Sequence, residues 1–210
     1  NTALPNSRVL IALSRALNVP VDFFFAEPEV NVVLEHVDYR KKSSMSKTQQ
    51  VAVEQQCTEM LNRYLSLELA VQDIKAVQDF VFARPVRTQD DAEEAAQQLR
   101  RDWDLGDDPI PNVVAMLEDK GYKVIEIETD SDFDGMKAHA GAARIIGLNK
   151  NITDSCRKRF TALHELAHHV LLFPSDMPER AKERLCHCFA GAVLFPKEQA
   201  LEAMHQGRFH

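Results

Sequence analysis

The sequence predicts an α+β fold in which helices come first, a small sheet follows and further helices end the chain. Apolar residues recur at helical spacing in much of the chain before residue 120, β-rich runs occupy 122–149, and helical patterns then return. No helical pattern separates the β-rich runs, so we expect a small antiparallel or mixed sheet rather than a regularly alternating parallel one.

The composition is that of a globular protein able to bury a core. The 210 residues are 45% hydrophobic and 27% charged. The net charge of −7 excludes a global attraction to nucleic acid or anionic membrane. No apolar run approaches the roughly 18 residues that span a bilayer. The 4 cysteines are irregularly spaced, which argues against a disulfide framework and favours a cytoplasmic protein with reduced thiols.

Helical patterns dominate the first third of the chain. A short amphipathic helix is expected over 5–17, capped by Asn6 or Ser7. Residues 26–46 are expected to be irregular, ending in a basic cluster that we interpret as a solvated linker. A long helix should follow over 47–68, with the pattern of either a core helix or a dimer helix.

Two shorter helices should precede the sheet. Residues 69–89 are interpreted as a connection, and a capped helix should start near Thr88 or Asp90 and end before Gly106. Its expected buried stripe is Ala92, Ala95, Ala96, Leu99 and Trp103. The next helix should run over 111–120, with a proline in its first turn and a glycine after its end.

The β-rich runs and the last helices complete the prediction. Strands are expected over 122–128 and 139–149. A helix with a largely apolar surface should cover 153–172, and a proline follows it. A final pair of helices is expected over 177–194 and 197–206.

The predicted helix over 153–172 contains the pattern H-E-x-x-H at His164, Glu165 and His168. Residues four apart project from one helix face, so both imidazoles can reach one zinc ion at about 2.0–2.1 Å. Glu165 lies roughly 100° around the helix, beside the metal, where it can move a proton between water and a leaving amine. His169 faces away from His168, and a surface or supporting role is expected for it.

A hydrolytic zinc site needs a third protein ligand, and the sequence around 179–188 offers several. Glu179, Glu183 and His187 share one face of the predicted helix. Glu183 would complete a His-His-Glu set, with His187 as its supporting partner. His187 as the ligand, or a thiolate from Cys186 or Cys188, stays open on spacing alone, and thiolates would favour a closed structural site.

Several segments in order resemble the ImmA/IrrE-type metallopeptidases, from about Gln89 to Pro196. They read EEAAQQLRRDWDLGDDPIPNVVAMLEDKGYKVIEI, DGMKAHAGAARIIGLN, RKRFTALHELAHHVL and ERLCHCFAGAVLFP. Each segment alone is weak evidence, whereas their order and spacing make the resemblance specific.

The resemblance implies a zincin-like domain with an H-E-x-x-H active-site helix beside a small sheet. Glu183 takes the position of the third zinc ligand, while His187 stands where an Asn is usual and Cys186 where an Ala is usual. The family also implies an edge strand that pairs with an extended substrate, and 139–149 is our prediction for that strand. Tyr122 and His139 are the predictions for a group that stabilises the oxyanion.

The N-terminal residues resemble the end of an Xre-type helix-turn-helix domain, which members of this family often carry. The implied domains are a helix-turn-helix remnant at 1–25, a linker with a long helix at 26–88, and a zinc metallopeptidase at 89–210. The recognition helix would lie before Asn1, so DNA binding is expected of a full-length N-terminal domain and little of these residues. A homodimer is also possible for such a fusion.

The resemblance implies an intracellular zinc endopeptidase that cleaves a helix-turn-helix-type transcriptional repressor. Its metal ligands would be His164, His168 and Glu183, and Glu165 would be the general base. Mn²⁺ or Fe²⁺ can occupy such a site as well as Zn²⁺. The alternative is a DNA-binding transcriptional regulator whose metallopeptidase-like domain is a sensor or interaction module with little activity, although a purely structural zinc site has no use for Glu165.

Overall fold

The computed structural model describes most of the chain, and the described ranges are 6–18, 20–25, 32–41, 45–130 and 133–205. Contacts divide the chain into two compact units, Asn1–Asn31 and Val32–His210, and each is described by itself. The domain boundaries predicted from the resemblance stay predictions.

The N-terminal unit contains helix α1 (Ser7–Leu17) and a short 3-10 helix, η1 (Val21–Phe24). The side chain of Asn6 caps α1 by accepting a hydrogen bond from the backbone N–H of Val9 at 3.1 Å. The helix predicted over 5–17 is therefore confirmed in its described part, while residues 1–5 lie outside the described residues. No residue of α1 is buried within the described structure of this unit.

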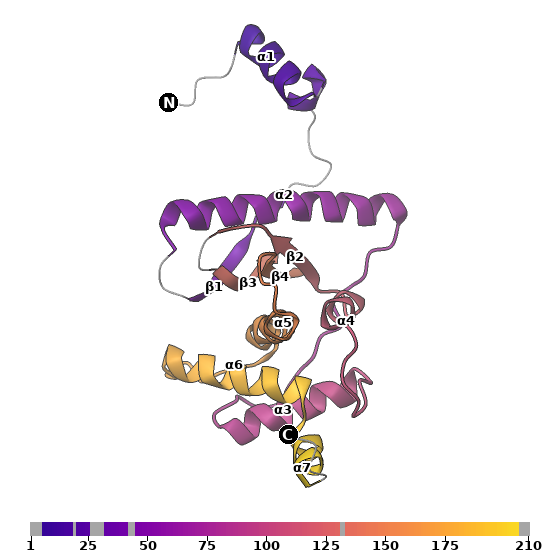
Figure 1. Cartoon of the computed structure of the whole chain (residues 1–210), viewed down its shortest axis with the longest axis vertical. Helices are drawn as coiled ribbons and strands as arrows, with labels where there is room; N and C mark the ends of the chain where they lie inside the picture. Colours follow the sequence, from indigo (N-terminus) through magenta and orange to yellow (C-terminus); the bar gives the residue numbers. More distant parts are fainter. Residues whose placement is uncertain (1–5, 19, 26–31, 42–44, 131–132, 206–210) are drawn as a thin grey trace. The chain divides into compact units, whose positions relative to one another are not determined.

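The second unit holds the sheet and the remaining helices (Figure 1). Its elements in chain order are β1 (Glu35–Lys41), α2 (Lys47–Val71), α3 (Gln89–Asp102), α4 (Val113–Asp119), β2 (Lys123–Ile127), β3 (Phe133–Ala140), β4 (Ala143–Asn149), α5 (Ser155–Val170), α6 (Glu179–Leu194) and α7 (Lys197–His205). The described residues thus form an α+β fold, as predicted. Among their helices, none is both long and apolar enough to cross a membrane.

The sheet has four strands in the order β1-β3-β4-β2. β1 and β4 both run antiparallel to β3, whereas β2 runs parallel to β4. The sheet is therefore mixed, one of the two arrangements that the sequence predicts. β3 and β4 are the inner strands, because β3 pairs with β1 and β4, and β4 pairs with β3 and β2.

The prediction of one strand over 139–149 is wrong in two respects. This range holds the end of β3, a turn and all of β4, so the chain folds back as a hairpin. Gly141 has a φ of 56° in the turn, where a residue without Cβ adopts the left-handed region without strain. In addition, β4 has strands on both sides, so its backbone groups are used within the sheet and cannot pair with a substrate.

The prediction of an irregular linker over 26–46 is also corrected, because β1 lies within it. The strand has no strong local pattern, since charged residues interrupt it at nearly every second position. Pairing with β3 supplies the backbone hydrogen bonds that its own sequence does not predict. Parts of the range, 26–31 and 42–44, lie outside the described residues.

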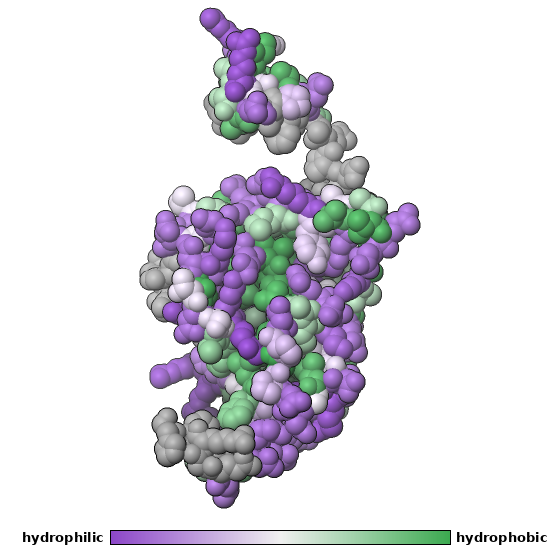
Figure 2. Space-filling model, turned by 45° about the vertical axis from the view of Figure 1, so that its right-hand side comes forward, coloured by the Kyte–Doolittle hydropathy of each residue, from purple (hydrophilic) through white to green (hydrophobic). Residues whose placement is uncertain are grey.

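The long helix α2 covers one face of the sheet, and α5 lies on the other (Figure 1). A capping box between Ser46 and Gln49 starts α2, in agreement with the helix predicted from residue 47. Near its other end, exposed apolar side chains form a patch at which Figure 2 shows hydrophobic surface. These side chains are Leu67, Leu69, Val71 and Ile74.

The helices on the α5 side are those that the sequence predicts. Thr88 caps α3 in a capping box with Asp91, and the whole predicted apolar stripe of this helix is buried. α3 packs against α6. The buried Arg100 joins the two by donating to the carbonyl oxygen of Val193 at 2.6 Å and to that of Gly106 at 2.9 Å. This packing holds α6 beside α5.

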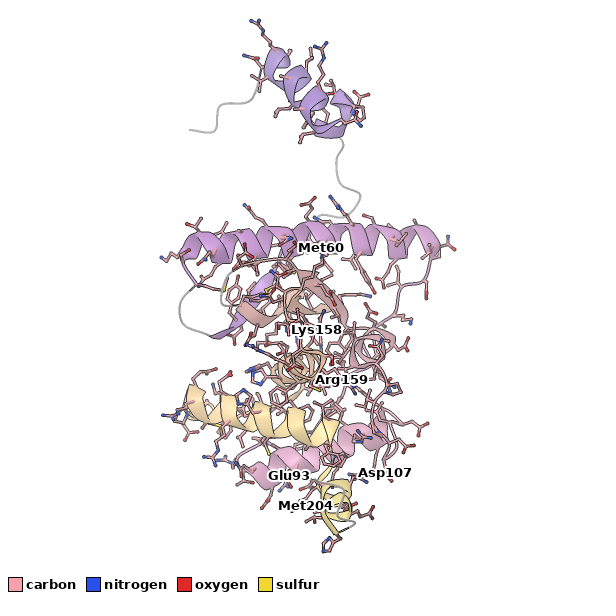
Figure 3. The ribbon with its side chains drawn as sticks, viewed as in Figure 1. Met60, Glu93, Asp107, Lys158, Arg159 and Met204 are labelled. Atoms are coloured by element: carbon pink, nitrogen blue, oxygen red, sulfur yellow. The ribbon has the colours of Figure 1, made fainter. Side chains whose placement is uncertain are left out.

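Two basic side chains fix the first half of α5 to its surroundings (Figure 3). The Nζ atom of Lys158 lies 2.6 Å from Oε1 of Glu126 on β2. Arg159 donates to the carbonyl oxygen of Ile110, in the loop before α4. α5 is therefore held between the sheet and the helical layer before it reaches its H-E-x-x-H residues.

Candidate metal centre

The helix that carries the motif has a well-defined start and a buried second half. The carboxylate of Asp154 accepts hydrogen bonds from the backbone N–H groups of Cys156 and Arg157, at 2.8 and 3.2 Å. His164 and Glu165 are both buried further along. The spacing of four places the Nε2 atoms of His164 and His168 only 3.1 Å apart, so the two imidazoles converge as the sequence predicts.

Glu183 of α6 completes this group. Its Oε2 lies 3.2 Å from Nε2 of His164, and its Oε1 lies 3.1 Å from Nε2 of His168. Burial pushes the pKa of Glu183 upward, but hydrogen bonds with the two imidazoles outweigh it and hold the pKa well below its usual range. Glu183 is therefore a carboxylate, the form that binds a metal.

The three contacts have the size that a metal site requires. In a tetrahedral zinc site with bonds near 2.1 Å, neighbouring ligand atoms lie about 3.4 Å apart. The three separations between His164, His168 and Glu183 are 3.1–3.2 Å, so a small expansion of the group would give the spacing of a ligand set. The chemistry of two imidazoles and one carboxylate also suits a divalent metal.

His187 lies on the edge of the same group. Its ring centroid is 4.6 Å from that of His164 and 5.7 Å from that of Phe160. His164, Glu183 and His187 each offer a ligand atom within 4.8 Å of the others, a second possible set that shares two residues with the first. We favour the set with His168, because its contacts of 3.1–3.2 Å are shorter. His187 is exposed.

The two cysteines of α6 make contacts other than those expected of metal ligands. The Sγ atom of Cys186 lies 3.7 Å from Nδ1 of His168, which is the ring nitrogen that does not face Glu183. This contact orients the imidazole, a function common for groups behind a metal ligand. Burial raises the pKa of Cys186, so its thiol stays protonated. The Sγ atom of Cys188 lies 3.7 Å from the carbonyl oxygen of Gln89. These contacts argue against either cysteine as a thiolate ligand of the metal.

The general base predicted from the motif lies against the sheet. The side chain of Glu165 is 1% exposed, and β3 passes it at Gly135. A Cβ added to Gly135 would lie 2.9 Å from Oε1 of Glu165 and 2.7 Å from Cγ2 of Thr161. A glycine is therefore needed at this position for the strand to approach the carboxylate so closely.

Sequence reasoning did not find Gly135 or a second residue of β3, Lys137. The Nζ atom of Lys137 donates to the carbonyl oxygen of His168 at 3.4 Å, near the end of α5. Both residues lie in the segment DGMKAHA, whose first five residues were not predicted to form a strand. The glycine itself, between Asp134 and Met136, was the available signal for a close approach of the backbone.

The other predicted polar residues form a separate cluster. The ring centroid of His169 lies 5.0 Å from that of His139 and 5.8 Å from that of Tyr122. His169 lies 2.9 Å, through Nε2, from the carbonyl oxygen of Ile145 on β4, and burial lowers its pKa to about 3. It supports the sheet rather than a metal. Tyr122 is fully buried and packs on Trp103, which favours a core role over oxyanion binding.

A cavity of about 1000 Å³ adjoins the metal-site residues. Glu183 and His187 line it from α6, and residues around Thr88 line it from the start of α3. Arg180 and Arg184 add positive charge to its wall. The group therefore lies beside a space that a substrate or water can enter, as a catalytic metal site requires and a closed structural one does not.

Comparison with known proteins agrees with this geometry. No curated protein matches the chain. Residues 118–209 match the family model of the IrrE N-terminal-like domain, Peptidase_M78. The match does not reach the N-terminal residues, so the helix-turn-helix interpretation of 1–25 stays a prediction. Residues 118–209, which include His164, His168 and Glu183, belong to the IrrE N-terminal-like (Peptidase_M78) family, and this membership implies a metallopeptidase.

Proposed function

We propose that the protein is a zinc-dependent endopeptidase whose metal ligands are His164, His168 and Glu183 and whose general base is Glu165. The observation that carries the proposal is the convergence of three side chains, in which the two imidazole Nε2 atoms lie 3.1 Å apart and each lies 3.1–3.2 Å from one oxygen of Glu183. The buried carboxylate of Glu165 beside it supports a catalytic rather than a structural site, because a structural zinc site has no use for it.

Each of these residues has its own role in the proposed hydrolysis of a peptide bond. Zinc held by the three ligands would polarise the scissile carbonyl and lower the pKa of a water molecule. Glu165 takes a proton from the attacking water and passes it to the nitrogen of the leaving amine. Gly135 leaves room for that carboxylate, and Cys186 orients the imidazole of His168 from behind. Substrate and product have access through the cavity beside Glu183.

The proposed substrate is a transcriptional repressor of the helix-turn-helix type, cleaved to release genes of a stress response or a mobile element. The resemblance to ImmA/IrrE-type peptidases supports this part of the proposal. DNA binding is proposed for the N-terminal domain of a longer chain, and a homodimer is proposed as the assembled form. Within the cell, Mn²⁺ or Fe²⁺ could replace Zn²⁺, since availability often decides which metal fills such a site.

Metal analysis of the purified chain tests the ligand set first. We expect one zinc per chain in the parent and in His187→Ala, and loss of zinc in Glu183→Ala. Glu179→Ala is the matched control, because Glu179 is an exposed glutamate of the same helix. Zinc that persists in Glu183→Ala and disappears in His187→Ala would show that His187 is the third ligand. A chain that binds no metal even after reconstitution would contradict the peptidase proposal.

Replacement of Glu165 tests the catalytic step. Incubation of the zinc-loaded chain with unfolded casein should yield fragments, and Glu165→Gln should lower the rate by at least about 10²–10⁴-fold while zinc stays bound. Equal rates for the parent and Glu165→Gln would exclude this residue as the general base. No cleavage by either form would favour the alternative, in which the domain acts as a sensor or interaction module of a DNA-binding regulator.

A further inference from the structure

The strand β1 comes from outside the matched domain but is paired with it. The family match covers 118–209 and so includes β2, β3 and β4, whereas β1 occupies Glu35–Lys41. In the order β1-β3-β4-β2, β1 pairs with the side of β3 that β4 leaves open. Without β1, the domain's sheet would end at β3, which would present a row of backbone N–H and C=O groups.

This edge of β3 lies next to the catalytic residues. At Gly135 the strand touches the side chain of Glu165, and at Lys137 it reaches the carbonyl oxygen of His168. Extended peptides commonly bind by adding a strand to an exposed sheet edge. The edge of β3 is therefore the place at which a peptide would lie closest to the general base, and β1 covers it with a segment of the same chain.

The pairing of β1 with β3 is irregular. Asp38 pairs with Lys137 and Tyr39 with Met136, but the register shifts on both sides of these two pairs. His36 has a φ of 50°, an uncommon conformation for a residue other than glycine. A strand with such interruptions makes fewer regular ladder hydrogen bonds than a continuous one.

The side chain of Tyr39 ties β1 to α2. The hydroxyl of Tyr39 donates to Oε1 of Glu54 at 2.7 Å and lies 3.2 Å from the carbonyl oxygen of Gln50. The ring of Tyr39 also lies 6.3 Å from that of Phe133, at the start of β3. Besides its pairing with β3, the strand is thus held on α2 by a hydrogen-bonded tyrosine, while β3 itself is held by β4 and α5.

We propose that β1 is an internal occupant of the peptide-binding edge of β3, and that an extended substrate segment pairs with β3 only after β1 has left. The proposal rests on the proposed peptidase function, since it identifies where that function receives its substrate. The apparent affinity of this edge for a peptide equals the intrinsic affinity multiplied by the fraction of molecules in which β1 is released. Changes that loosen β1 therefore tighten peptide binding.

A labelled peptide with the sequence of residues 33–41, VLEHVDYRK, is the probe. Its binding is measured by fluorescence anisotropy to zinc-loaded protein carrying Glu165→Gln, so that the probe is not cleaved. Tyr39→Phe removes only the hydroxyl that bonds to α2 and should tighten binding about tenfold, which is the effect of one lost hydrogen bond. Tyr64→Phe, on α2 away from β1, is the matched control and should leave binding unchanged.

A disulfide supplies the opposite change. Asp38→Cys combined with Lys137→Cys joins directly paired positions of β1 and β3. The oxidised form should not bind the probe, and reduction should restore binding. Probe binding that is equal in the oxidised and reduced forms, undetectable in every variant, or no tighter in Tyr39→Phe than in the parent overturns the proposal. The assay needs no turnover, so its outcome is independent of whether the chain cleaves casein.

Discussion

The two helices on opposite faces of the sheet, α5 and α2, differ in how they use their residues. Eight of the 16 residues of α5 are buried, because the sheet covers one side and α6 another. Only three of the 25 residues of α2 are buried, since α2 covers the sheet from outside. The comparison teaches that buried polar groups on α5 must be satisfied by one another, by neighbouring elements or by a metal, whereas the polar groups on α2 mostly face water.

The largest expected effect comes from removing one buried leucine from each helix. Leu163 and Leu61 are both 0% exposed, so each change to Ala should lower the free energy of unfolding by roughly 2–5 kcal/mol. Leu163 precedes His164, and its cavity should also weaken the gain in stability that added zinc gives. Urea unfolding with and without zinc measures both. An equal loss of the zinc effect in Leu61→Ala would show that the two faces are not independent.

The next effect tests the one buried ion pair between α2 and the sheet that the described residues contain. Lys123 of β2 and Glu68 of α2 are paired, with side chains 5% and 13% exposed. Lys123→Met leaves the carboxylate of Glu68 without its cation and should cost about 3 kcal/mol of unfolding free energy. Adding Glu68→Leu should recover most of this loss in denaturant titrations. A double variant as unstable as the single one would mean that lost packing, rather than the unpaired charge of Glu68, causes the loss of stability.

A pair of glycines on neighbouring strands gives a smaller and more specific effect. Gly135→Ala places a Cβ against Glu165 and Thr161, while Gly147→Ala places one 2.8 Å from Cγ of the flexible Met136. We expect Gly135→Ala to cost roughly 1–3 kcal/mol and to slow casein cleavage with zinc retained. Gly147→Ala should slow cleavage less. Thermal unfolding and initial rates of cleavage measure the two effects. Equal rates in both variants would contradict the proposed role of Gly135, which is to leave room for Glu165.

The smallest effect is expected at a less buried ion pair on the α5 side. Lys158 and Glu126 have side chains that are 22% and 41% exposed, so water screens their attraction. Lys158→Ala should change the unfolding free energy by less than about 1 kcal/mol, and less still in 1 M salt. A loss of stability comparable with that of Lys123→Met would show that the difference in exposure does not determine how much each ion pair stabilises the protein.

Local spacing was sufficient to predict much of the molecule. The helices that became α2, α3, α5 and α6 were found from apolar periodicity and caps, because these signals lie within a few residues of one another. The same reasoning placed His164, Glu165 and His168 on one helix. Glu183 was one of several possible third ligands, and its assignment still depends on metal analysis.

Only the tertiary structure decided the features that depend on pairing between distant segments. β1 was predicted to be irregular, and one strand was predicted over 139–149, which holds the end of β3, the turn and β4. The position of Gly135 against Glu165 was not predicted at all. The physical reason is that a helix satisfies its backbone hydrogen bonds within its own sequence, whereas a strand needs a partner whose identity its own residues do not encode. For this protein, the sequence by itself determined the H-E-x-x-H motif, and the fold determined which strand lies beside it.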